Sequence, residues 1–374
     1  MSPPPVSSHA DLWRQVQVGR PLPFNIRDAD RTLLLATGQV IASEAQIQAL
    51  RQRGALTDDG VPVRTRVEHA APEELPALWA ECMGGVDAAL RASEASHFKA
   101  ALEDAAEPVL ALIARDPDLA IFQVLLQSPD EHVRYGVNHS VHAAITTHLV
   151  AQRLAWPRAQ VQVAFKAALT MNVAMIELQG RLATQVSPLT PLQRATIREH
   201  PTRGVELLQA AGITDAQWLT AVAQHHEVPD GSGYPLRLRE VGEIASLVRR
   251  ADIYTSKLSS RSTRSALAAN RAAREIFMQD PNDAMNNAII KEFGVYPPGC
   301  CVRLASGELG IVVRRGATAN APIVASLVDA RGRTLAEPLR RDTADRCHQV
   351  ADTLLADAMH VRIDPAKLVA LACA

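Results

Sequence analysis

Two adjacent histidines before a glycine-rich loop form the strongest chemical signal in the chain. After two intervening residues, His225-His226-Glu227 is followed by Asp230-Gly231-Ser232-Gly233-Tyr234-Pro235. Neutral imidazole is a common ligand of first-row metals, and glycine lets a backbone turn sharply and approach a ligand closely. The string therefore indicates a metal or ligand site, although Tyr234 and Pro235 also fit an ordinary turn.

Further candidate residues lie in the same helix-rich stretch. His139 lies on a helix expected to begin near Tyr135, and His200 lies on a helix for which Thr190 is the expected N-cap. Each has a simpler alternative, because His139 can be a core histidine and His200 a helix-end residue. The remaining candidates are Asp252, which can instead pair with Arg249 or Arg250, and Arg261 and Arg264.

The order of these residues, with Gly233-Tyr234-Pro235 intact, resembles the HD-GYP family over about 135–280. That bacterial signalling family is a helical bundle that holds two or three metal ions, usually iron or manganese. It hydrolyses cyclic di-GMP to a linear dinucleotide or to GMP. The resemblance implies a set of metal ligands at His139, His200, His225, His226 and Asp252. It also implies phosphate contacts from Arg261 and Arg264, and partner contacts at Gly233, Tyr234 and Pro235.

The chain departs from the family at the HD dipeptide itself. Where the family has Leu-His-Asp-Ile-Gly-Lys, this sequence has Thr170-Met171-Asn172-Val173-Ala174-Met175. Tyr135 replaces an acidic residue that often precedes the first histidine, and Thr255 replaces a second aspartate. Met171 and Met175 are spaced to fill an apolar helix face.

These substitutions remove most of one metal site. The family chemistry uses paired cations about 3.5–4 Å apart, bridged by a carboxylate. Asn172 is neutral, and the Met171 thioether is a soft donor that suits manganese or ferrous iron poorly. His139 and Asp252 remain at one site, and His200, His225 and His226 remain at the other. We expect one divalent transition metal, iron, manganese or zinc, at the three histidines, or none.

Three functional hypotheses follow from this reduced site. The first is a catalytically impaired HD-GYP protein that acts as a regulatory or binding module in cyclic di-GMP signalling. Its partners would be cyclic di-GMP, the linear dinucleotide or a diguanylate cyclase-type signalling protein. The second is an active cyclic di-GMP phosphodiesterase that uses His200, His225 and His226. The third is a scaffold without a ligand, so whether the chain is an enzyme stays open.

Composition narrows the class of protein. The chain has 374 residues and a net charge of −1, and aromatic residues make up 4%. These values argue against a nucleic-acid binder or a polybasic membrane anchor. The five cysteines are irregularly spaced, which argues against disulfides or a cysteine zinc site and fits a reducing compartment. No signal peptide is evident, and no apolar run approaches about 18 residues. We expect a cytoplasmic protein with no DNA, RNA or membrane partner.

The pattern along the chain predicts a mainly α protein built on an HD-type helical bundle. We expect a small α/β N-terminal module at 1–65, a helical connecting region at 66–130, an HD-GYP helical domain at 131–290 and a β-rich C-terminal extension and tail at 291–374. Within this scheme 61–71 resembles a linker, and Val161–Ile176 resembles one continuous buried helix. After the last strand, near 345, we expect a helix or tail.

Overall fold

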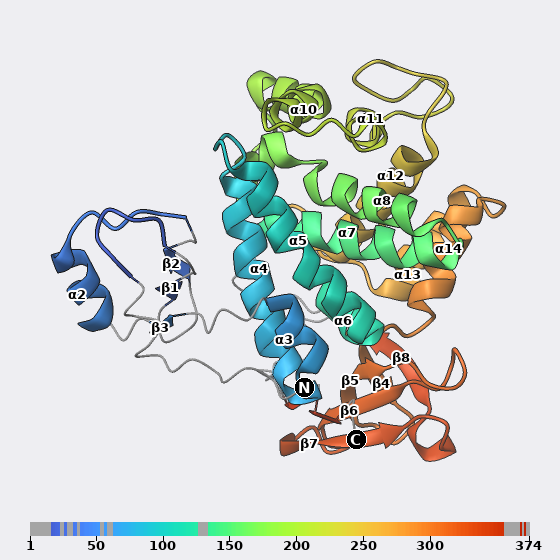
Figure 1. The fold of residues 1–374 in the computed structure, drawn as a ribbon. Helices are drawn as coiled ribbons and strands as arrows, with labels where there is room; N and C mark the ends of the chain where they lie inside the picture. The colour runs from blue at the N-terminus through green and yellow to red at the C-terminus, as the bar shows by residue number, and fades with distance from the viewer. Residues whose placement is uncertain are drawn as a thin grey trace.

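The computed structural model describes residues 16–22, 26–27, 33–35, 38–52, 56–57, 63–125, 134–354, 367–368 and 370–371. The chain is mainly helical, with a small sheet near each end, as the sequence predicts. Figure 1 shows the helices stacked above the C-terminal sheet.

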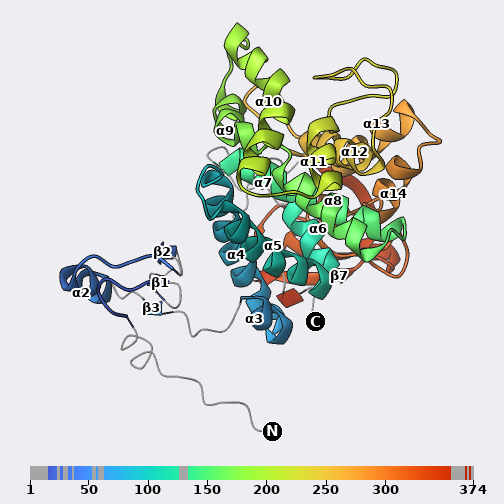
Figure 2. The same cartoon turned by 45° about the horizontal axis from the view of Figure 1, so that its top comes forward.

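The N-terminal unit is a three-stranded antiparallel sheet with one helix. Its strands are β1 (Ile26–Arg27), β2 (Leu33–Leu35) and β3 (Leu56–Thr57), in the order β2-β1-β3. Helix α2 (Glu44–Gln52) begins after Ser43, whose hydroxyl accepts a hydrogen bond from the Gln46 amide at 3.3 Å. The unit has its own small core, and both ribbon views draw it beside the bundle (Figure 1 and Figure 2).

The connecting region begins with a helix where the sequence indicated a linker. Helix α3 (Val63–His69) buries Val67, and Arg66 reaches Glu81 at 3.1 Å. Its other charges face solvent, which explains why the stretch lacks a clear apolar pattern. The region continues with η1 (Pro72–Glu74), α4 (Leu75–Arg91), α5 (Phe98–Arg115) and α6 (Pro117–Leu125).

Helix α7 (Tyr135–Arg153) is the central element of the bundle. It packs against α6, α8, α9, α12 and α14, and nearly all of its side chains are buried. The other helices are α8 (Arg158–Thr170), η3 (Val173–Met175), α9 (Ile176–Thr184), α10 (Pro191–Ala210), α11 (Ala216–Gln224), α12 (Glu243–Leu258), α13 (Ala269–Gln279) and α14 (Ala284–Phe293).

The helix expected over Val161–Ile176 is interrupted at the family's HD position. Helix α8 ends at Thr170, whose hydroxyl donates to the Lys166 carbonyl at 2.8 Å and accepts from the Trp218 indole at 2.8 Å. Such backward bonding by threonine bends helices. Asn172 then leaves the helical region, with φ −106° and ψ 13°, before η3 begins. The interruption turns Met171 and Asn172 toward the interior, where both are buried.

The C-terminal extension is a five-stranded antiparallel sheet in the order β7-β6-β5-β4-β8. It reaches further than expected, because β7 is nine residues long and one more strand follows residue 345. Residues 367–368 and 370–371 are helical, in line with the helix or tail expected at the C-terminal end. The strands are β4 (Cys301–Leu304), β5 (Leu309–Arg314), β6 (Ile323–Val328), β7 (Thr334–Asp342) and β8 (Val350–Leu354).

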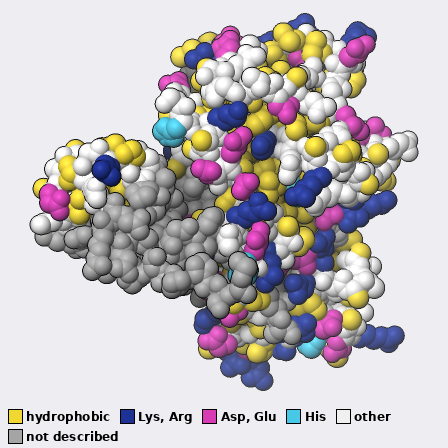
Figure 3. Space-filling view, viewed as in Figure 1, with side chains coloured by type: hydrophobic (Ala, Val, Ile, Leu, Met, Phe, Trp, Pro, Cys, Tyr) yellow, Lys and Arg dark blue, Asp and Glu magenta, His cyan; other side chains and the backbone are white. Residues whose placement is uncertain are grey.

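One stretch, Arg158–Thr184, is long and apolar enough on average to cross a membrane, so the expectation of no such stretch was too strict. However, 72% of that window is buried within the fold, as expected for the core helices α8 and α9. On the visible face, basic and acidic side chains are interspersed over the bundle and sheet (Figure 3). This mixture fits the net charge of −1.

Candidate metal centre

Three histidines converge where α10 approaches the end of α11. Helix α10 begins at a capping box in which Thr190 accepts from the Gln193 amide at 3.2 Å, confirming the expected N-cap, and it carries His200. His225 and His226 follow the last turn of α11. One ligand atom from each of His200, His225 and His226 lies within 4.8 Å of the others.

Two of these imidazoles are fixed in the tautomer that suits a metal. Nδ1 of His200 lies 2.6 Å from the Ile197 carbonyl, and Nδ1 of His225 lies 2.7 Å from the Val222 carbonyl. A carbonyl only accepts, so each Nδ1 carries the proton and each Nε2 carries a lone pair. The two Nε2 atoms face one another at 3.0 Å.

Facing lone pairs require a cation or a proton between them. Burial lowers the pKa of His200 to about 3 and also lowers the pKa of His225, so a proton is unfavourable at neutral pH. For a metal–nitrogen bond of about 2.1 Å, two ligands at a right angle would stand about 3.0 Å apart. The histidines therefore fit a first-row divalent metal.

The loop after the histidines fits tightly against them. The Tyr234 ring stacks on His226, with 4.5 Å between ring centres. A side chain at Gly233 would come within 2.5 Å of the backbone at Glu227 and Val228, so only glycine fits there. The sequence indicated Glu227 only as part of the string, yet its buried carboxylate accepts from the amides of Leu236 at 2.6 Å and Leu238 at 2.9 Å.

His139 and Asp252 bond to each other. His139 Nε2 donates to Asp252 Oδ1 at 2.7 Å, between α7 and α12. Burial alone would raise the pKa of Asp252, but this hydrogen bond and the nearby histidines outweigh it and hold that pKa well below its usual range. Asp252 bonds to His139 and not to Arg249 or Arg250, and Arg250 binds Asp283 at 2.9 Å. To bind a metal through Nε2, His139 would have to lose the proton on that atom and break its hydrogen bond to Asp252.

The replaced positions contribute few metal-ligand atoms. Met171 and Met175 are buried, in agreement with the expected core-filling role. Asn172 is 1% exposed, and its Oδ1 has no hydrogen-bond partner among the described residues. The Thr255 hydroxyl donates to the Ala251 carbonyl of its own helix at 2.8 Å.

The two arginines expected to contact phosphate already have partners in the chain. Arg261 Nε donates to the Tyr135 hydroxyl at 2.8 Å and the guanidinium lies over that ring, 5.0 Å from its centre. Arg264 donates to the Ser256 carbonyl. His142 and His148, on the same helix as His139, are both buried.

Comparison with known proteins identifies the domain that contains this centre. The family model described as HD domain matches residues 127–276. This stretch is therefore similar to an HD domain, and it is called the HD domain below. It contains the intact loop Gly233-Tyr234-Pro235.

The chain is similar to two curated cyclic di-GMP phosphodiesterases. One, from Pseudomonas aeruginosa, is 27% identical over 237 residues, which cover 62% of this chain and 56% of that protein. The other, the response regulator RpfG of Xanthomonas campestris, is 30% identical over 136 residues, which cover 35% of each chain. The chain therefore spans about half of the first relative and a third of the second. An HDGYP protein from Bdellovibrio bacteriovorus has a TM-score of 0.46 at 14% identity, covering 74% of this chain and 96% of that one.

One feature of the HD domain carried no signal in the sequence. Arg194, Arg198 and Arg237 line a cavity of about 600 Å³ together with Tyr234. Surface arginines are common in any sequence, and these three are spread over 44 positions. Only the approach of α10 to the loop brings them together.

Proposed function

We propose that the protein is a catalytically impaired HD-GYP module that acts by binding in cyclic di-GMP signalling in the cytoplasm. The observation that carries this proposal is the direct bond between His139 and Asp252 beside the replaced pair Met171-Asn172. Two residues that would hold one cation instead satisfy each other, and the bridging carboxylate is missing. The likeness to two curated cyclic di-GMP phosphodiesterases supports the signalling context.

In this proposal a single divalent ion, iron, manganese or zinc, binds His200, His225 and His226. Such an ion would supply a Lewis acid that polarises a phosphoryl oxygen. The chain's own residues orient the imidazoles through the Ile197 and Val222 carbonyls. The ligand would be cyclic di-GMP or its linear dinucleotide. A diguanylate cyclase-type protein would bind at the loop Gly233-Tyr234-Pro235, next to which Leu236 is 64% exposed.

Elemental analysis and turnover of the full chain test the proposal. We expect at most one tightly bound metal ion per chain, and cyclic di-GMP hydrolysis at least about 100-fold below the roughly 1 s⁻¹ of a working enzyme. The double variant Met171→His with Asn172→Asp should bind more metal and melt at a higher temperature in manganese, because binding to the folded state stabilises it.

The same measurements can contradict the proposal. Two or more stoichiometric metal ions in the parent chain would rule out the reduced site. If the double variant binds no more metal than the parent, the surviving residues do not converge on a usable site, and a scaffold without a ligand becomes the better account. Met171→Leu with Asn172→Leu serves as the matched control, since it changes the same positions without adding a ligand.

A second function has one specific observation in its favour. The facing Nε2 atoms of His200 and His225, 3.0 Å apart, are arranged as a working metal site would need them. An active phosphodiesterase that uses this reduced site would hydrolyse cyclic di-GMP near 1 s⁻¹. His225→Ala would then abolish turnover, whereas for an impaired module it would change metal content alone.

A further inference from the structure

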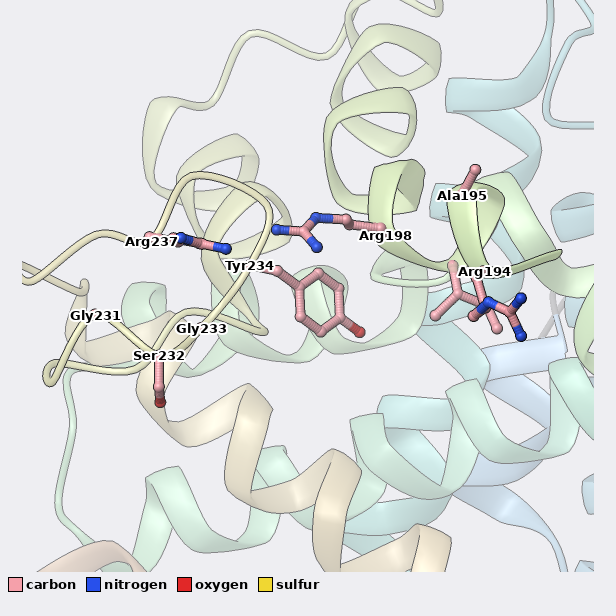
Figure 4. Close-up of a pocket in the computed structure, with 9 residues that line it drawn as sticks. Arg194, Ala195, Arg198, Gly231, Ser232, Gly233, Tyr234 and Arg237 are labelled. Atoms are coloured by element: carbon pink, nitrogen blue, oxygen red, sulfur yellow. The ribbon is translucent and has the colours of Figure 1, made fainter. Parts of the chain in front are cut away.

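A basic cavity lies beside the metal centre. It has a volume of about 600 Å³ and is formed by α10 and the loop 231–237. Arg194 and Arg198 project from α10, and Arg237 projects from the loop (Figure 4). In that view the guanidinium groups of Arg198 and Arg237 point toward one another near the Tyr234 ring, and the Tyr234 hydroxyl is directed to the side where Arg194 lies.

The convergence of these charges lacks a counter-charge. No aspartate or glutamate lines the cavity among the described residues. Arg194 donates to the Leu189 carbonyl, while Arg198 and Arg237 have no ion-pair or hydrogen-bond partner within the described part of the chain. Like charges that point at one another repel. An anion between them would remove that repulsion and supply the acceptors that the guanidinium groups lack.

The backbone at Arg237 adds a second, independent observation. Its φ is +57°, in the left-handed region that residues other than glycine seldom adopt. The Arg237 side chain is exposed, so no packing in the described structure accounts for an arginine there. A strained backbone position that carries a charged, unpaired side chain into a cavity is typical of a binding residue.

We propose that this cavity binds the phosphate of a small phosphomonoester, and that it gives the protein a preference for a 5′-phosphorylated dinucleotide over a cyclic one. The preference for the 5′-phosphorylated dinucleotide rests on the proposed function. A phosphomonoester carries a charge of about −1.5 to −2 and three terminal oxygens. Each phosphodiester of a cyclic dinucleotide carries one charge and two terminal oxygens. Three guanidinium groups around one cavity match the monoester better, in both charge and number of acceptors.

The cavity is next to the metal centre and separate from it. Tyr234 lines the cavity and stacks on His226, so a single ring connects the two sites. Ile197 also lines the cavity, and its carbonyl anchors His200. A dinucleotide held at its 5′-phosphate by the arginines would therefore have its remaining part near the three histidines. Arg261 and Arg264 are not needed for this contact.

Calorimetric titration of the full chain with two matched dinucleotides tests the proposal. The probes are the linear guanosine dinucleotide with a 5′-phosphate, pGpG, and the same dinucleotide without it, GpG, both in the presence of EDTA to remove metal. We expect pGpG to bind at least about tenfold more tightly than GpG. The double variant Arg198→Gln with Arg237→Gly should bring this ratio close to one. Arg203→Gln is the control, because Arg203 lies on the same helix but pairs with Glu206 at 2.8 Å.

Arg237→Gly also separates binding from folding. Glycine adopts the left-handed backbone without strain, so the variant should melt at the same temperature as the parent or higher. A ratio near one for the parent chain, or an unchanged ratio in the double variant, would overturn the proposal. If neither dinucleotide binds, the proposed function fails, and inorganic phosphate then tests whether the cavity binds phosphate at all. The melting temperature in phosphate is compared with that in chloride at equal ionic strength. A higher value in phosphate that is absent in the double variant supports the site, and no difference refutes it.

Discussion

Glu227 stabilises the GYP loop from within the protein. Its carboxylate is 1% exposed and accepts two backbone amides of the loop, those of Leu236 and Leu238. Hydrogen bonds to a charged acceptor contribute about 1.5–3 kcal/mol each. Glu227→Gln keeps the shape but loses the charge and one acceptor oxygen. We expect it to lower the free energy of unfolding by about 2 kcal/mol and to speed hydrogen exchange at 236 and 238. Glu199→Gln, on the exposed face of α10, should change neither the free energy of unfolding nor hydrogen exchange at 236 and 238. Equal hydrogen-exchange rates at these two amides in both variants would show that Glu227 does not stabilise the loop.

His148 makes the fold sensitive to acid. It is buried on α7 with its ring edge against Phe165, and burial lowers its pKa to about 4 from about 6.5 in the unfolded chain. Below pH 6.5 the unfolded state therefore binds a proton that the folded state does not, so stability is lost as pH falls. At pH 5 this difference corresponds to about 2 kcal/mol.

Removal of that imidazole should flatten the pH dependence. We expect His148→Leu to be close to the parent in stability at pH 7 and about 2 kcal/mol more stable than the parent at pH 5, measured by urea unfolding at both values. His97→Leu, at an exposed position, is the control. A constant difference between His148→Leu and parent across this pH range would show that packing, not proton binding, dominates.

At the scale of elements, an ion-pair network joins the sheet to the helices. Arg315, after β5, donates from Nη1 to Glu292 of α14 at 3.0 Å and from its amide to Asp118 of α6 at 3.0 Å. Its guanidinium also donates to Asp118. Arg153 of α7 also binds Glu292. The two carboxylates are only 13% and 10% exposed, so each would be poorly solvated without its partner.

Arg315→Ala should destabilise the protein by about 3 kcal/mol, because it leaves two nearly buried carboxylates without their main partner. Arg333→Ala is the matched control. Arg333 pairs with Asp329 at 2.7 Å but is 70% exposed, and such surface pairs contribute about 0.5 kcal/mol. Urea unfolding measures both. Similar losses in the two variants would mean that the network does not hold the sheet against the helices.

Elements with local signals were predictable from the sequence, and those set by distant contacts were not. Thr190 identified a helix start because a cap acts on its own first turn. The break after Thr170 depends on Trp218, 48 residues away, and so has no local signal. The histidines of the candidate centre were recognisable by residue type and spacing. The bond between His139 and Asp252, and the meeting of three arginines, depend on how α7, α10 and α12 pack.

At the scale of the whole molecule, the HD domain and the β extension share one core. Residues of β4, β5 and β6, such as Cys301, Ile311 and Ile323, belong to the same buried cluster as α7 and α12. The predicted boundary near 290 therefore falls within a continuous core, and the sheet and bundle should unfold together. The N-terminal unit has a separate core built from residues such as Ile26, Ile41 and Ile47.

The pairing of His139 with Asp252 has a consequence for how the protein folds. A chain whose buried acidic ligands need a cation for neutralisation folds only when that cation is supplied. Here the partly buried carboxylate of Asp252 has an internal partner, and the three candidate ligands are imidazoles. We therefore expect folding to need no metal ion to neutralise Asp252.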